Sequence, residues 1–178
     1  MKKIYSISTK NLEIVSFQER FLSEKYVNWL NNKELMRYSD QRFKIHTKES
    51  CVNYFKSFKG SENKFWAILA KDNDDKTHIG NITTTFDINH GVVDISILIG
   101  DKNFHGRGFG KESWLSMIQY LSKDVRVRKI TAGTLEVNKP MLSLIKFAKM
   151  TKDGTKVKQC RYNDKYVDML YFSLFPKH

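Results

Sequence analysis

Cysteine is scarce in this chain, and long apolar runs are missing. Only two cysteines, Cys51 and Cys160, occur in 178 residues, and their spacing matches neither a disulfide framework nor a metal site. We therefore expect two free thiols in a reducing cytoplasm, packed as small apolar side chains, and no bound metal. No run approaches the ~20 apolar residues of a membrane-spanning helix. Residues 1–6 are basic but lead into no apolar core, so no secretory signal is predicted.

The chain also has few acidic side chains for its number of basic ones. Its 19 Asp and Glu stand against 31 Lys and Arg, which gives a formal net charge of +12 at pH 7. The lysines are dispersed, and neither an arginine-rich tract nor a nucleic-acid-binding motif accompanies them, which disfavours nucleic acid as a partner. A solvated basic surface explains this charge. So does attraction to an anion such as a phosphorylated cofactor, a nucleotide-linked substrate or RNA.

Length and patterning predict one domain, residues 1–178, without internal repeat, linker or low-complexity segment. Alternating or β-branched apolar runs predict strands, and capped runs of 3.6-residue periodicity predict helices. Turns are expected at residues 71–76 and 89–91. The predicted strands are 11–17, 64–70, 77–88, 92–100, 129–135, 155–162 and 166–175. Four helices are predicted. The first follows Ser23 as N-cap, and the second follows Thr47 as N-cap and ends at Gly60. The third covers 111–122, and the fourth has Pro140 in its first turn and covers 141–148.

One stretch combines a strand, a glycine-rich turn and the start of a helix. After the apolar run 95–99 come Gly106, Gly108 and Gly110, and then a helical pattern. The first amides of a helix lack intrahelical partners and carry partial positive charge. Glycines let an anion approach the backbone closely, and Arg107 and Lys111 add charge beside it. The stretch therefore predicts an anion site, with a merely flexible turn as the alternative.

Two common phosphate-binding motifs do not match this turn. No Gly-Lys-Ser/Thr follows the glycines, as the phosphate loop of nucleotide hydrolases requires. The Gly-x-Gly-x-x-Gly spacing of dinucleotide-binding units is also missing.

The run His105-Gly106-Arg107-Gly108-Phe109-Gly110 instead resembles the acetyl-CoA motif of the GNAT superfamily of N-acetyltransferases. That motif is an apolar strand, then Gln/Arg-x-x-Gly-x-Gly/Ala, then a helix, and His105 stands where Gln or Arg is usual. A second segment, Trp29–Tyr38, resembles the Trp-Leu-Asn-Asp-x-Glu-Val segment of the ribosomal-protein, RimJ/RimL-type branch. Asn138, after the strand 129–135, matches an Asn that commonly contacts the CoA arm. The resemblance covers roughly residues 10–175.

The resemblance implies an α/β (α+β) fold, a mixed twisted sheet of about seven strands flanked by helices. It implies acetyl-CoA as co-substrate, held mainly by backbone amides of the glycine turn. Within the strand 95–99 the family places a β-bulge, pairs the pantetheine like an extra strand, and offers a splayed amide to the thioester carbonyl. The cofactor-binding residues expected in this way are Ile97, Leu98, Ile99, His105, Gly106, Arg107, Gly108, Phe109, Gly110, Lys111 and Asn138.

The general base is less clearly marked. The incoming ammonium must lose a proton to a carboxylate, a histidine or a chain of ordered water. Asp94, where the branch often carries an acid, is the first candidate, and Glu136 is the second. The Tyr often used as general acid has no counterpart, and the helix-ending Gly-Phe of the family is Lys149-Met150 here. A Ser-His-Asp mechanism has no supporting pattern.

We expect an enzyme that transfers acetyl from acetyl-CoA to a primary amine, acting as a monomer or homodimer away from membranes. The basic charge leans toward an anionic acceptor such as a nucleotide-linked amino sugar, which Arg42, Lys44 and His46 could meet. A protein N-terminus and a small amine or drug are alternatives within the branch. A non-catalytic CoA-binding or RNA-associated module, and a basic nucleic-acid-binding domain, are alternatives of another class.

Overall fold

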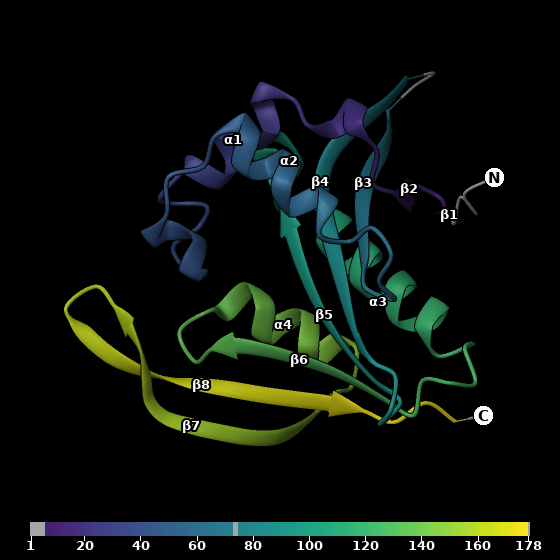
Figure 1. Ribbon diagram of the computed structural model, residues 1–178. Helices are drawn as coiled ribbons and strands as arrows, with labels where there is room; N and C mark the ends of the chain where they lie inside the picture. Colours follow the sequence, from purple (N-terminus) through teal and green to yellow (C-terminus); the bar gives the residue numbers. More distant parts are fainter. Residues whose placement is uncertain (1–5, 73–74, 178) are drawn as a thin grey trace.

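The computed structural model describes residues 6–72 and 75–177 and builds them around one mixed sheet (Figure 1). In this part of the chain the sheet has eight strands, in the order β1-β2-β3-β4-β5-β6-β8-β7. The strands are β1 (Ser6–Ser8), β2 (Leu12–Ser16), β3 (Lys64–Asp72), β4 (Asp75–Asp87), β5 (Val92–Ile99), β6 (Lys129–Leu135), β7 (Thr151–Tyr162) and β8 (Lys165–Leu174). The helices are α1 (Glu24–Asn31), α2 (Lys48–Lys56), α3 (Phe109–Leu121) and α4 (Lys139–Phe147), with 3-10 turns η1 (Glu19–Phe21), η2 (Asp40–Phe43) and η3 (Lys102–Phe104).

The predicted fold class and the seven predicted strands are confirmed, and one strand is added. β1 is a three-residue edge strand, too short for a periodicity argument, that pairs antiparallel with β2. β7 begins at Thr151, four residues before the predicted start, and α2 ends at Lys56, before Gly60. The first five residues and the tip of the 71–76 turn, 73–74, lie outside the described residues. No helix of the described residues is long and apolar enough to span a membrane.

The predicted helix caps are confirmed. The Ser23 side chain accepts a hydrogen bond from the Tyr26 amide at the start of α1. At the start of α2, Thr47 and Ser50 bond each other's backbone amides in a capping box. These side chains satisfy amides that the helix itself leaves free, and so they fix where each helix begins.

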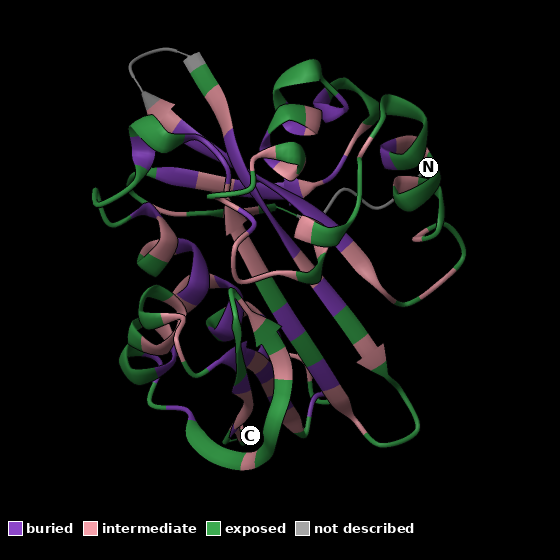
Figure 2. Cartoon of the chain, turned by 90° about the vertical axis from the view of Figure 1, so that its left-hand side faces the viewer, coloured by how far each residue is buried: buried purple, intermediate pink, exposed green. Residues whose placement is uncertain are grey.

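The central strand β3 is apolar on both faces, and helices cover both faces and bury these side chains. Phe65, Ala67 and Leu69 pack with α1 and α2 in one cluster. The alternate residues, Trp66 and Ile68 among them, pack with α3 and α4 in the other. Figure 2 shows buried positions concentrated in the middle of the sheet and exposed ones in the outer loops. The sheet interior is therefore held from both sides, while its β8–β7 end is mostly exposed along β7.

The sheet opens between its two parallel strands. β5 pairs with β6 only over Val92–Asp94 and Lys129–Thr131. Beyond Asp94, the described structure pairs β5 only with β4, and the two parallel strands separate (Figure 1). The β-bulge expected in residues 95–99 is not found, because β4 and β5 pair without interruption from Gly80–Ile99 to Asp87–Val92. The irregularity lies in β4 instead, where Ile79 is passed over between Gly80 and His78.

A close contact fixes α1 against the end of β5. A Cβ on Gly100 would lie 2.0 Å from the nearest atom of the Trp29 ring, and Trp29 is buried. Only a glycine therefore lets β5 end this close to α1. Lys25 of α1 also forms an ion pair with Asp101, at 2.6 Å, just before the glycine turn.

We expect Gly100→Ala to destabilise the fold, since the buried Trp29 ring cannot move aside without repacking α1. Overpacking of this kind costs about 1–3 kcal/mol, which urea unfolding would register as a lower midpoint. Gly154→Ala is the matched control, because a Cβ there meets nothing within 4 Å. Equal midpoints for the two variants would show that the contact does not constrain the fold.

Candidate active site

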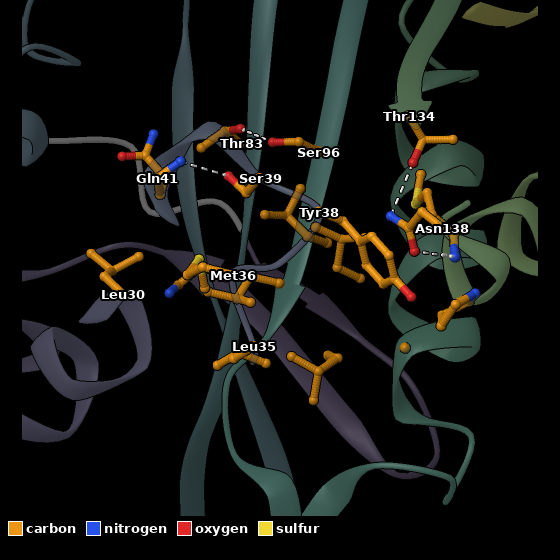
Figure 3. A pocket seen from close by; sticks show the side chains of 18 of the residues that line it. Leu30, Leu35, Met36, Tyr38, Ser39, Gln41, Thr83, Ser96, Thr134 and Asn138 are labelled. Atoms are coloured by element: carbon orange, nitrogen blue, oxygen red, sulfur yellow. Dashed lines mark hydrogen bonds between the residues drawn. The ribbon is translucent and has the colours of Figure 1, made fainter. Parts of the chain in front are cut away.

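A large cavity occupies the opening between β5 and β6. Its volume is about 1260 Å³, and its wall includes parts of β4, β5, β6, α4, the glycine turn and the segment 35–46. Figure 3 labels some of these residues, among them Thr83, Ser96 and Asn138. Most of the predicted cofactor-binding residues share this wall: Ile97, Leu98, Ile99, His105, Gly106, Gly108, Gly110, Lys111 and Asn138. Arg107, Phe109, Asp94 and Glu136 do not line it.

The glycine turn has the backbone and the open space that an anion needs. Gly106 and Gly108 have φ of 71° and 86°, in the left-handed region that side chains disfavour. A Cβ at either position would meet nothing within 4 Å, so the space over the turn is free. Gly108 is also the N-cap of α3 and offers no side chain to its first amides. These amides are therefore available to a phosphate group of a ligand.

Aromatic packing supports the turn from beneath. Phe109 is buried and its ring packs edge-on to Phe104, at 5.2 Å between centroids. The exposed Arg107 guanidinium lies over both rings, 5.0 Å from Phe104 and 5.3 Å from Phe109. Lys111 is the cation of this group that lines the cavity, with its Nζ 3.7 Å from the Phe147 ring centroid. The structure thus gives Phe109 a supporting position and Lys111 a position at the cavity, beside the glycine turn.

His105 ties the turn back to β5. Its Nε2 lies 2.8 Å from the Ile99 carbonyl oxygen, and because a carbonyl only accepts, Nε2 carries the proton and donates. The residue that departs from the family pattern therefore joins the end of the strand to the glycine turn. Sequence reasoning had no evidence for this bond.

The free edge of β5 forms a second part of the site. Residues 95–99 are bonded to β4 on one side and have no strand on the other in the described structure. Their outward backbone groups can therefore pair with an extended ligand as with an added strand. Ile97, Leu98 and Ile99 are half-buried along this edge.

Asn138 has local partners in the opposite wall. Its Oδ1 accepts from the Met141 amide, at 3.3 Å, and so caps α4. Its Nδ2 donates to the Thr134 hydroxyl at 3.0 Å (Figure 3). The side chain thereby joins the end of β6 to the start of α4 at the cavity wall.

The two candidate bases lie at different ends of β6. Asp94 sits where β5 and β6 separate and accepts from the Thr131 hydroxyl, at 2.9 Å. Partial burial of its carboxyl group raises the pKa of Asp94, and the smaller effect of the Thr131 hydrogen bond lowers it. The residue as a whole is exposed, so water reaches it. Glu136 follows the end of β6, and its carboxylate accepts from the Asp168 amide of β8, at 2.9 Å. The structure does not bring the two carboxylates together.

Contacts that sequence reasoning missed hold the segment around η2 against the β7–β8 hairpin, beside the cavity. Tyr38 stacks on Tyr162 of the β7–β8 hairpin, with 5.7 Å between ring centroids. Arg42 donates to the Arg161 carbonyl of the same hairpin, at 2.6 Å. On the back wall Thr83 and Ser96 share a hydroxyl hydrogen bond of 2.5 Å (Figure 3). Among the described residues no cluster of His, Cys, Asp and Glu could hold a metal.

Comparisons with known proteins find acetyltransferases that are similar in sequence or in fold. An N-acetyltransferase 9-like protein of Nematostella vectensis is 27% identical over 150 residues, covering 78% of this chain and 74% of that protein. A Salmonella typhimurium acetyltransferase that modifies the N-terminal serine of a ribosomal protein has a TM-score of 0.80 at 13% identity, covering 97% of this chain and 100% of that chain. A microcin self-immunity acetyltransferase solved with acetyl-CoA and AMP has a TM-score of 0.79 at 13% identity, covering 94% of this chain and 93% of that chain.

The likeness to the ribosomal-protein enzyme is consistent with the RimJ/RimL-type branch expected from Trp29–Tyr38. Residues 12–151 match the family model described as the acetyltransferase (GNAT) domain. Since this match covers most of the chain, and the fold has the sheet and glycine turn that the resemblance implies, the protein belongs to the GNAT family of acetyltransferases.

Proposed function

We propose that this acetyltransferase moves the acetyl group of acetyl-CoA to a primary amine carried by an anionic molecule, such as a nucleotide-linked amino sugar. The observation that carries the proposal is the single cavity that joins the glycine turn, the free edge of β5 and the cationic segment 37–46. One molecule can thus lie on the turn and the strand while another enters from the side of η2.

The first two features suit acetyl-CoA. The amides of Gly108 and the first turn of α3, with Lys111 beside them, would hold its phosphates. The amide groups of its pantetheine arm would pair with the edge of β5 along Ile97–Ile99, as an added strand. A backbone N–H of this edge would donate to the thioester oxygen, where negative charge develops during transfer. Acetyl-CoA supplies the activated acyl group.

The charges of the wall favour an anionic acceptor. Apart from Lys111, which lies beside the phosphates of CoA, the lining includes the cations Arg37 and Lys44 and one carboxylate, Asp40. Asp40 is 81% exposed and lies 3.6 Å from Arg42, which offsets its charge. A polyamine would need carboxylates for its several ammonium groups, and the described wall offers only this one. A phosphate or carboxylate on the acceptor would instead meet unopposed positive charge.

Asp94 is the proposed general base, acting through water. It lies two residues before Ser96, which lines the cavity, and on the same face of β5. Glu136 is less suited, because its carboxylate is bonded to the backbone of β8. As the amine nitrogen forms its bond to the acyl carbon, the C–S bond breaks and the sulfur takes the electron pair. The proton of the amine passes to Asp94 by way of the intervening water.

Replacing Asp94 with asparagine first tests the raised pKa of this carboxylate, through the pH dependence of stability. Because the pKa of Asp94 is raised in the fold, the folded state binds this proton more tightly than the unfolded state, and the ionised form weakens the fold. Asp94→Asn should therefore be the more stable protein in urea at pH 7. Its advantage should shrink as pH falls through the raised pKa and vanish below about 3.9, the unfolded value.

Asp94→Asn should also transfer acetyl at least about 100-fold more slowly than the parent, measured with the amine that the acceptor screen finds to be preferred. It should also lose the rise of turnover with pH that ionisation of Asp94 gives the parent. An unchanged pH profile would exclude Asp94 as the base.

An acceptor screen tests the proposed class of substrate. Release of CoA thiol would be followed with acetyl-CoA and one amine at a time: a uridine-diphosphate-linked amino sugar, a peptide with a free N-terminus, and spermidine. We expect the nucleotide-linked amino sugar to be preferred in kcat/KM by at least about tenfold, the effect of one charge-assisted contact. Preference for the peptide or for spermidine would contradict the anionic class. Binding of acetyl-CoA without thiol release for any amine would indicate a non-catalytic module.

A further inference from the structure

A second group of basic side chains lies in the cavity wall, away from the glycine turn. Arg37, Lys44 and His46 all line the cavity, and all belong to the segment between α1 and α2. This segment is anchored at its end, because Asn31 of α1 bonds both the amide and the carbonyl of His46, each at 2.8 Å. The cations are thus carried by a fixed segment rather than by a loose loop.

The charges of Lys44 and Arg37 are available to a ligand, whereas the Nε2 of His46 lies 3.4 Å from the Gln41 carbonyl oxygen. Within residues 6–72 and 75–177, Lys44 has neither an ion pair nor a side-chain hydrogen bond. The Arg37 guanidinium donates to the Glu34 carbonyl, at 2.6 Å, and lies 4.6 Å from the Tyr38 ring centroid. The guanidinium thus lies over an aromatic ring and is bonded to a backbone carbonyl, and no carboxylate of the described structure lies at ion-pair distance from it.

Arg42 does not belong to this group, although the sequence placed it there. Its side chain is 13% exposed, and its guanidinium donates to the carbonyls of Ser39, at 2.7 Å, and Arg161, at 2.6 Å. It therefore braces the segment against the β7–β8 hairpin, as the stack of Tyr38 on Tyr162 also does. The brace holds the shape of the cationic wall before any ligand arrives, which reduces the entropy lost on binding.

Neutral hydrogen-bond donors complete the wall. Ser39 accepts the Gln41 amide with its hydroxyl oxygen, at 3.3 Å, which leaves the hydroxyl proton free to donate (Figure 3). The Gln41 side chain also lines the cavity. Two cations, a hydroxyl and an amide form a donor set suited to the several oxygens of a diphosphate, and the His46 imidazole lies in the same wall.

We infer that Arg37, Lys44 and His46 form a diphosphate-binding site for a nucleoside-diphosphate-linked acceptor, occupied at the same time as the glycine turn holds CoA. The inference rests on the proposed function, because it assumes that the glycine turn is taken by CoA. A cavity of about 1260 Å³ has room for both molecules, with the acceptor amine between the two anion sites.

Calorimetric titration of uridine diphosphate into the full chain with saturating CoA tests this site. We expect one equivalent to bind without displacing CoA, with an affinity that falls as salt rises. Lys44→Ala should weaken binding about tenfold or more, and so should Arg37→Met, which keeps an apolar stem over Tyr38. Lys48→Ala is the matched control, because Lys48 is an exposed cation four residues after Lys44 and does not line this cavity. The affinity of this variant for uridine diphosphate should stay within about twofold of the parent's.

The outcomes separate the inference from the proposed function. Inorganic pyrophosphate that binds with the same dependence on Lys44 supports the diphosphate site. The diphosphate site is overturned if uridine diphosphate competes with CoA, if it binds equally to Lys44→Ala and the parent, or if it fails to bind. Spermidine that binds while the diphosphate does not also overturns it. If the parent fails to bind CoA itself, the proposed function fails. Thermal unfolding of each variant verifies that the substitutions leave the fold intact.

Discussion

The separation of β5 from β6 is the constraint on which the site depends. Two parallel strands that pair over only three residues each leave the rest of β5 with one bonded edge and one free edge. In a folded protein such backbone groups need partners, and here the partners can come from a ligand. The same separation makes room for the cavity, so one feature of the sheet provides both the space and the hydrogen-bonding edge.

The surrounding contacts keep that opening in place. At the end of β5, Gly100 lies against the Trp29 ring and His105 bonds the Ile99 carbonyl, so the strand and the glycine turn are held to each other and to α1. On the other arm, β6 is bonded to β8, and Asn138 joins the end of β6 to α4. The β7–β8 hairpin then returns to η2 through Arg42 and Tyr162. Each arm is thus fixed by its own neighbours, which lets the gap between the arms stay open.

Local patterns predicted the strands, the helix caps and the glycine turn, because periodicity, capping chemistry and glycine conformation are properties of short segments. The mixed sheet flanked by helices and the family came from the resemblance of the residues around His105 and Trp29, and the strand order did not. What the sequence could not show are contacts between distant segments. The Arg42 bond to the Arg161 carbonyl joins residues 119 apart, and it turned an expected ligand-binding cation into a brace. The separation of β5 from β6 beyond Asp94 likewise depends on which strands pair. For this reason the bulge expected in residues 95–99 was wrong, and the position of Asp94 outside the cavity wall was not predicted.

The central claim is that acetyl-CoA binds with its phosphates on the glycine turn. Calorimetric titration of acetyl-CoA into the parent, Gly108→Glu and Gly60→Glu tests it most directly. Both glycines have a positive φ and open space around a Cβ, so the backbone strain of the two substitutions is matched. Only Gly108→Glu places a carboxylate at the start of α3. The account predicts that the parent and Gly60→Glu bind alike, while Gly108→Glu loses at least about tenfold in affinity. Equal binding by both variants, or no binding by the parent, would contradict it.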